Sequence, residues 1–89
     1  MLKIDISKRA RKFLEKLPPK QARQLTTKIL ELRKSPEPPD SIKLKGYEHY
    51  RRADFGEYRI VYFVKDDVLM ILLVGKRNDE EIYKQLKRL

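Results

Sequence analysis

The spacing of apolar residues changes halfway along the chain, and this change constrains the fold more than any other feature of the sequence. In residues 7–34 apolar side chains recur every three or four positions, as they do along one face of a helix. Residues 58–65 are instead rich in β-branched and aromatic residues and fit the two-residue period of a strand, and residues 68–74 are apolar throughout. This order predicts an α+β fold.

The first half reads as a short strand followed by two helices. Residues 2–6 alternate between apolar and polar side chains, and Ser7 is a good N-cap for the helix that follows. Because Pro18 and Pro19 end that helix and a second one restarts at once, residues 7–34 form a helical hairpin.

The second half reads as strands and one last helix. Residues 42–45 and 50–54 are weaker strand candidates ahead of the two strong ones, and Asn78 caps a helix at residues 79–88. The predicted architecture is therefore an N-terminal strand, a helical hairpin, a mostly antiparallel four-stranded sheet and a short C-terminal helix. We expect one domain over residues 1–89, because a chain of this length closes one modest core.

Charge and composition narrow the function. The formal net charge is +9, and residues 1–34 alone hold 11 basic and 3 acidic side chains, so anionic partners are expected. With no Cys and one His, His49, the chain has no thiol chemistry and no zinc site built on several His, and we expect neither a metal nor a cofactor. The longest apolar run is far shorter than a membrane span, and we expect a cytoplasmic protein.

The hairpin around residues 54–57 brings two arginines together in either of two registers. If Phe55 and Gly56 form a two-residue loop, Arg52 lies directly opposite Arg59; if residues 54–56 form a three-residue loop, Arg51 lies there instead. At a separation of about 6 Å, like charges repel by about 0.7 kcal/mol in water and by more at lower dielectric. We therefore expect something anionic between the two guanidiniums.

The next hairpin adds to this cluster in a way that depends on its loop. A three-residue loop at residues 65–67 places Arg77 on the face of Arg59, whereas a two-residue loop places Lys76 there. Periodicity leaves two readings of Tyr83, which either hangs over the end of the sheet or packs half-buried against it.

These residue types suit an RNA backbone. Guanidinium groups grip phosphate oxygens, and an aromatic ring stacks on an unpaired base. The same set suits cleavage by the 2′-hydroxyl of the RNA without a metal, in which arginines stabilise the charge on phosphorus and a phenol or lysine moves protons. From composition alone, simple nucleic-acid binding is favoured over catalysis.

Three motifs follow one another along the second half of the chain: Lys-Leu-Lys-Gly at 43–46, the strand core Gly-Glu-Tyr-Arg-Ile-Val-Tyr at 56–62, and Val-Gly-Lys-Arg at 74–77 followed by Glu-Ile-Tyr at 81–83. Taken in this order, they resemble the RelE/ParE superfamily of type II toxin-antitoxin toxins, and the RelE branch most of all. The resemblance implies a RelE-like fold and metal-independent cleavage of mRNA in the A site of a translating ribosome.

The resemblance also assigns roles to residues. Arg59 matches the arginine that stabilises the transition-state phosphate, Arg77 matches a second catalytic arginine near the leaving group, and Tyr83 matches the tyrosine that stacks on the substrate base and assists proton transfer. Arg52 matches one of two strand lysines, and Tyr50 falls at the place of the other. The remaining substrate-binding candidates are Arg51, Lys76, Tyr50 and Lys45.

Partners follow from the same resemblance. It implies a 70S ribosome with its mRNA, and a cognate antitoxin that forms a hetero-oligomer with the toxin and can displace residues 79–88. Two alternatives stay open. One is a ParE-like inhibitor that binds DNA gyrase without chemistry of its own; the other is a merely basic RNA-binding module with salt-sensitive affinity.

Overall fold

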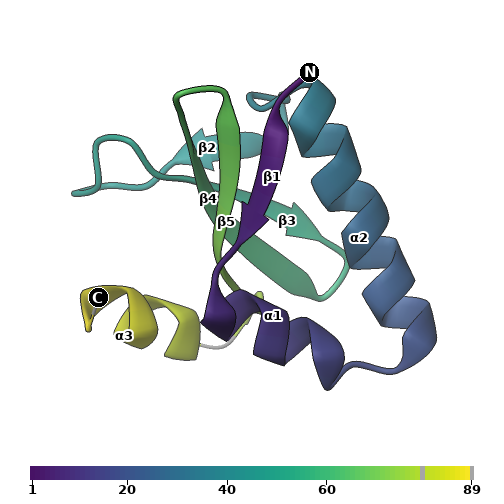
Figure 1. Ribbon diagram of the computed structural model, residues 1–89. Coiled ribbons are helices and arrows are strands. Elements are labelled where there is room, and N and C mark those ends of the chain that lie inside the picture. The colour runs from purple at the N-terminus through teal and green to yellow at the C-terminus, as the bar shows by residue number, and fades with distance from the viewer. Residues whose placement is uncertain (79, 89) are drawn as a thin grey trace.

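A computed structural model describes residues 1–78 and 80–88. It contains five strands and three helices within these residues (Figure 1). In chain order they are β1 (Lys3–Ile6), α1 (Lys8–Glu15), α2 (Pro19–Lys34), β2 (Ser41–Lys43), β3 (Arg51–Phe55), β4 (Tyr58–Lys65), β5 (Val68–Lys76) and α3 (Glu81–Lys87).

All five strands belong to one sheet in the order β1-β5-β4-β3-β2. The four later strands pair antiparallel, as the sequence predicts, and β1 joins them at the edge by pairing parallel with β5. The α+β class is confirmed, and the sheet gains a fifth strand because the predicted N-terminal strand is part of it. Ser7 links the strand to the helix as expected, since its Oγ accepts a hydrogen bond from the Ala10 N–H at 3.0 Å.

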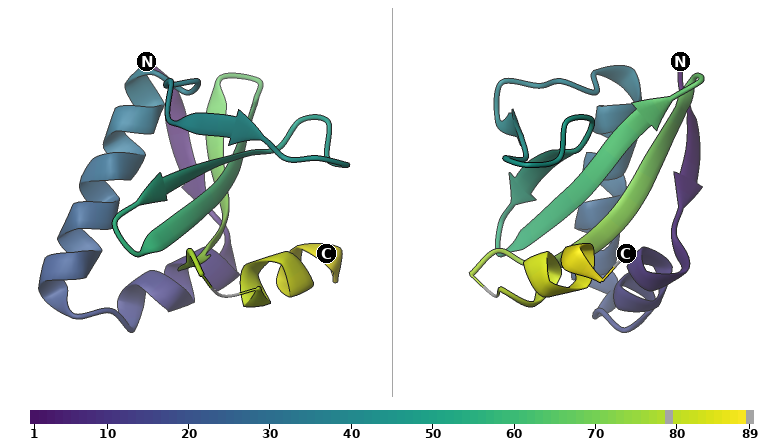
Figure 2. Two further views of the ribbon diagram at one scale, coloured as in Figure 1. Left: turned by 180° about the vertical axis from the view of Figure 1, so that it is seen from behind. Right: turned by 90° about the vertical axis from the view of Figure 1, so that its left-hand side faces the viewer.

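Helices cover both faces of the sheet (Figures 1 and 2). On one face α1 and α2 pack their apolar stripes over the main core, in which Leu25, Leu32, Ile60 and Ile71 are almost fully buried. On the other face α3 packs through Ile82 and Leu86 against Val61 and Leu73. Since β4 and β5 are covered on both faces over this stretch, their apolar content is explained.

The register of the β3–β4 hairpin differs from both predicted alternatives. The two-residue loop is Gly56-Glu57, so that Phe55 pairs with Tyr58 and Asp54 lies directly opposite Arg59. Gly56 has a φ of +59°, a conformation that favours glycine at the first position of such a loop. The prediction that an arginine faces Arg59 across the hairpin is therefore wrong.

The β4–β5 hairpin has a two-residue loop, because Lys65 pairs with Val68 and Asp66 and Asp67 both have positive φ. This loop alone would put Lys76 on the face of Arg59. A register shift follows Val61, however: Tyr62 pairs with Ile71 and Val61 with Leu73. The extra residue reverses the alternation beyond it, so Arg59 pairs with Gly75 and residue 77 shares its face.

The last helix begins later than predicted. Its first residue is Glu81 and its N-cap position is Glu80, which makes no side-chain capping bond, so the predicted cap at Asn78 is wrong. Of the predicted range 79–88, residue 79 lies outside the described residues. The Cβ of Ile82 packs directly over Gly75, where an added Cβ would lie 3.4 Å away, and this contact lets α3 sit close to β5.

Candidate functional site

Arg59 is the centre of the candidate site. It lies near the start of β4 on the face that α3 covers, and its side chain is 13% exposed. Its Nε and Nη2 donate to the two carboxylate oxygens of Asp54 at 2.6 and 3.1 Å, and its Nη1 donates to the Tyr83 hydroxyl at 2.6 Å. The guanidinium is therefore held side-on by a carboxylate and joined by its other nitrogen to the last helix.

Two more arginines lie beside the ion pair of Arg59 and Asp54. Arg52 lies two residues before Asp54 on the same face of β3, with its Nη1 3.8 Å from the Asp54 Oδ2. The Arg77 N–H donates to the Glu57 carbonyl at 2.7 Å, which extends the β4–β5 pairing and fixes the start of its side chain beside the Arg59 face. Three predicted catalytic arginines thus lie around one carboxylate.

The electrostatics follow from this geometry. The hydrogen bonds from Arg59 hold the pKa of Asp54 below its ordinary value of 3.8, with further lowering by the charges of Arg52 and Arg77. The same carboxylate raises the pKa of Arg59, and Tyr83 raises it further. Asp54 is therefore an anion and Arg59 a cation at every physiological pH.

Tyr83 is the fourth predicted catalytic residue, and it reaches the cluster from α3. Its ring centroid lies 5.7 Å from the Arg59 guanidinium carbon, within the outer range of a cation–π contact. It is half-buried, as the second of the two sequence readings has it: its ring packs against the core between α3 and the sheet, and its hydroxyl meets Arg59.

Tyr50, at the expected lysine position, is part of an aromatic stack. Its ring lies between that of Tyr47, at 5.6 Å between centroids, and that of Phe63, at 5.4 Å, with both pairs nearly parallel. The side chain at this position is therefore a packed aromatic ring and not a flexible ammonium group.

The remaining predicted binding residues are divided between regions. Lys45 lies near the cluster, in a groove that Arg52 and Tyr83 also line. Lys76 alternates to the opposite face, where it lies in a depression with Phe13 and Val74.

Arg51 also points away from the arginine cluster. Its Nη2 donates to the Ser41 Oγ at 2.9 Å, and its Nη1 meets a Glu37 carboxylate oxygen at 3.3 Å. These contacts hold the proline-rich segment against β3, which is a structural role.

Asp54 is the site residue that sequence reasoning missed. The signal for it was present, because a carboxylate lies two residues before Gly56, close to the turn between two arginine-bearing strands. Within residues 1–78 and 80–88, no group of three His, Cys, Asp or Glu side chains is placed to hold a metal ion. None of the helices described is long and apolar enough to cross a membrane.

Comparison with known proteins identifies the class. Residues 4–81 match a family model described as the ParE toxin of the type II toxin-antitoxin system, parDE. The chain therefore belongs to the RelE/ParE superfamily of type II toxin-antitoxin toxins, and its structural matches place it in the RelE branch. No curated protein sequence matches it significantly.

Solved RelE structures match nearly the whole fold. The isolated Escherichia coli RelE toxin is 29% identical, with a TM-score of 0.76, covering 99% of this chain and 97% of that one. RelE in the archaeal RelE–RelB complex from Pyrococcus horikoshii is 32% identical, with a TM-score of 0.76 and coverage of 86% and 96%. The toxin-antitoxin complex RelBE2 from Mycobacterium tuberculosis matches at 25% identity, with a TM-score of 0.75 and coverage of 85% and 98%.

Proposed function

We propose that this toxin is a ribosome-dependent endoribonuclease, which inhibits translation by cleaving mRNA in the ribosomal A site through attack of the RNA's own 2′-hydroxyl. The observation that carries the proposal is the Arg59 guanidinium, fixed by Asp54 on one side and joined to the Tyr83 hydroxyl on the other. A positioned cation next to a phenol provides charge stabilisation and a proton-bearing group in one place.

The chemistry needs no external nucleophile. The 2′-hydroxyl gives its proton to a solvent water as its oxygen attacks the adjacent phosphorus and the bond to the 5′-oxygen breaks. The 5′-oxygen takes up a proton in turn, so the products are a 2′,3′-cyclic phosphate and a 5′-hydroxyl. Arg59 stabilises the added negative charge on the phosphoryl oxygens, with Arg52 beside it. Arg77 stabilises the negative charge that develops on the leaving 5′-oxygen. Since the Tyr83 oxygen accepts from Arg59, its own hydrogen remains to be donated to that leaving oxygen.

A cognate antitoxin is part of the proposal. The matched structures of Pyrococcus horikoshii and Mycobacterium tuberculosis are complexes with an antitoxin, which supports the same kind of partner for this chain. The last helix is short and is anchored by two buried side chains, Ile82 and Leu86, and the Tyr83 hydrogen bond. Displacement of α3 by the partner would remove Tyr83 from Arg59 and switch the site off.

Primer extension on a defined mRNA tests the proposal, with purified protein added to reactions with and without translating ribosomes. We expect breaks at codon positions in the translating reaction only. Arg59→Lys keeps the positive charge beside Asp54 but loses the forked geometry, so it should lower cleavage at least 100-fold. Lys65→Ala, at the far end of the same strand, is the control and should cleave normally. Breaks without ribosomes would remove the ribosome from the proposal.

A second function has one observation in its favour, because the matching family model is described for ParE toxins. A ParE-like protein would bind DNA gyrase and block it without cleaving RNA. Gyrase supercoiling assayed with the purified toxin separates the two functions. Loss of supercoiling together with intact mRNA would replace the nuclease by the gyrase inhibitor.

A further inference from the structure

A groove beside the arginine cluster is not used by the chemistry proposed above. It has a volume of about 280 Å³ and lies between the β2–β3 connection and α3. Leu44 and Leu86 contribute apolar surface to it, and Arg52 and Tyr83 line both this groove and the cluster around Arg59. Anything bound at Arg59 therefore has a direct continuation into the groove.

One wall of the groove is the ring of Tyr47, and the structure holds this ring in place. The ring stacks on Tyr50, which stacks in turn on Phe63. The backbone of the connection is closed by hydrogen bonds from the Tyr47 N–H to the Leu44 carbonyl at 3.2 Å and from the Tyr50 N–H to the Tyr47 carbonyl at 3.1 Å. An aromatic surface fixed in advance loses little conformational entropy when a ligand stacks on it.

The charge of the groove is also one-sided. Lys43, Lys45 and Arg52 line it, and among the residues that the structure describes no Asp or Glu does. A groove that combines aromatic rings, an apolar floor and cations matches an unpaired nucleotide, whose base stacks while its phosphate meets the cations. The carboxylates of an acidic peptide would pair with the cations, but such a peptide would offer no flat base to stack on the tyrosine rings of the groove.

We propose that this groove is a subsite for one unpaired nucleotide of the RNA, adjacent to the nucleotide held at Arg59, with its base stacked on Tyr47 and its phosphate held by Lys43 and Lys45. The proposal rests on RNA being the substrate, as argued above. Tyr47 then determines which codons are held firmly enough to be cut, because stacking strength differs among bases.

The test is equilibrium binding of a six-nucleotide RNA with 2′-O-methyl groups, which cannot be cleaved through the 2′-hydroxyl. Fluorescence anisotropy at low salt measures its affinity for three proteins. Loss of a stacked base by Tyr47→Leu should weaken binding roughly 10-fold. Phe13→Leu is the matched control, since it removes a half-buried ring that belongs to the other core and lies outside both the stack and the groove, and should bind as the wild type does.

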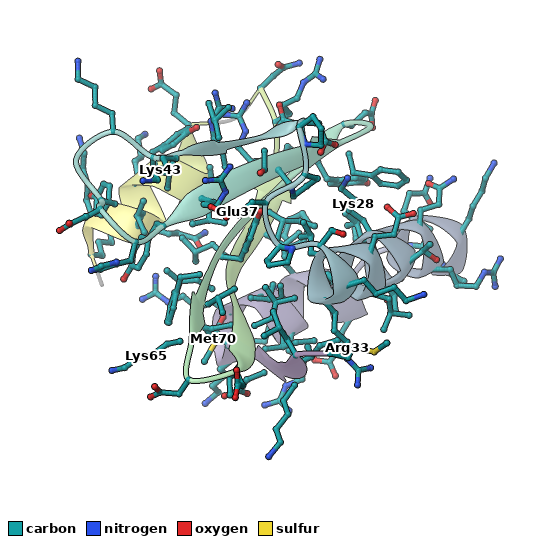
Figure 3. All side chains as sticks on the ribbon, turned by 90° about the horizontal axis from the view of Figure 1, so that it is seen from above. Lys28, Arg33, Glu37, Lys43, Lys65 and Met70 are labelled. Carbon is teal, nitrogen blue, oxygen red and sulfur yellow. The ribbon has the colours of Figure 1, made fainter. Side chains whose placement is uncertain are left out.

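Two single-lysine variants, one inside the groove and one outside it, provide a second comparison. Lys45→Ala should weaken binding and make its salt dependence shallower, because one phosphate contact is lost. Lys65→Ala, at the tip of the β4–β5 hairpin and well apart from Lys43 in Figure 3, should change neither.

Wild-type protein keeps the test informative even if a variant fails to fold. In an NMR titration with the same RNA, signals of Leu44, Tyr47 and Leu86 should shift, and those of Met70 should not. Equal affinities of the Tyr47 and Phe13 variants, or unshifted Leu44 and Leu86 signals, would overturn the subsite. A Tyr47 effect confined to antitoxin binding would overturn it too, and assign the groove to the protein partner. Because the RNA is uncleavable, a positive result stands even if the nuclease proposal fails.

Discussion

Asp54 determines where the Arg59 guanidinium points, and this makes it a positioning residue for the proposed cleavage. Asp54→Asn removes the charge but keeps the size, so one nitrogen of Arg59 is released from its bidentate contact. We expect kcat to fall between about 10-fold and 100-fold while KM stays equal or decreases, because the site becomes more positive. Single-turnover cleavage of mRNA on programmed ribosomes measures both. Asp54→Glu should restore part of kcat, and an unchanged kcat in Asp54→Asn would remove the positioning role.

The same ion pair predicts how stability depends on pH. Arg59 lowers the pKa of Asp54 in the folded state, so the folded protein binds a proton there less readily than the unfolded chain does. The contribution is complete above the unfolded value of about 3.9 and is lost as the pH falls through the lower, folded value. Because the Asp54 side chain is 31% exposed, we expect only about 1 kcal/mol.

Urea unfolding of wild type and Asp54→Asn between pH 3 and pH 7 measures this contribution. The difference between them should be constant from pH 5 to pH 7 and should shrink below about pH 4. A difference that grows on acidification would contradict the assignment of the lowered pKa.

Among single residues, the motifs indicated which candidate residues lie close together better than the hairpin geometry did. Arg59, Arg52 and Tyr83 were predicted from their sequence context, and the structure brings them together. The argument from opposed arginines was wrong, since a one-residue change in loop position put Asp54 opposite Arg59 instead. The position of the turn sets the register of the hairpin. Phe55-Gly56 and Gly56-Glu57 both contain the glycine that such a loop favours, so the sequence does not distinguish between them.

At the level of elements, periodicity predicted the helices and the two long strands with nearly correct bounds. It did not predict the register shift after Val61, because the residues around it are apolar on both faces and leave no alternation to read. Nor did it predict the late start of α3, whose N-cap residue Glu80 makes no side-chain capping bond.

The docking of α3 yields a prediction of its own. Ile82 is 3% exposed, and Ile82→Ala removes most of its contact with β5. A buried Ile→Ala change typically costs about 2–5 kcal/mol, but the loss here is limited by the free energy of undocking this one short helix. Hydrogen exchange should show amides of α3 losing protection while those of β4 and β5 keep theirs. Lys87→Ala on the exposed side of α3 is the control, and equal loss in β5 would mean that α3 unfolds only with the whole sheet.

At the scale of the whole molecule, cations lie on both faces of the sheet. The arginine cluster occupies the α3 face, whereas much of the +9 net charge lies on α1 and α2 across the sheet. Because α1 and α2 pack on the opposite face of the sheet from Arg59, we expect their cations to contribute to binding an anionic surface and not to the proposed cleavage at the cluster.

The salt dependence of ribosome binding tests this difference between the two sets of cations. Replacing the exposed Lys8, Arg11 and Lys12 of α1 with Gln removes three charges without touching the core. Each phosphate contact contributes about 0.7–0.9 to the slope of log affinity against log salt, so the slope for ribosome binding should become shallower by as much as about 2–3. Binding of the uncleavable oligonucleotide at the arginine cluster should be unchanged. A second variant, with Gln at Lys3, Lys34 and Lys65, carries the same net charge and should behave as the wild type does. If both variants lose affinity equally, only net charge matters, and α1 makes no specific contact with the ribosome.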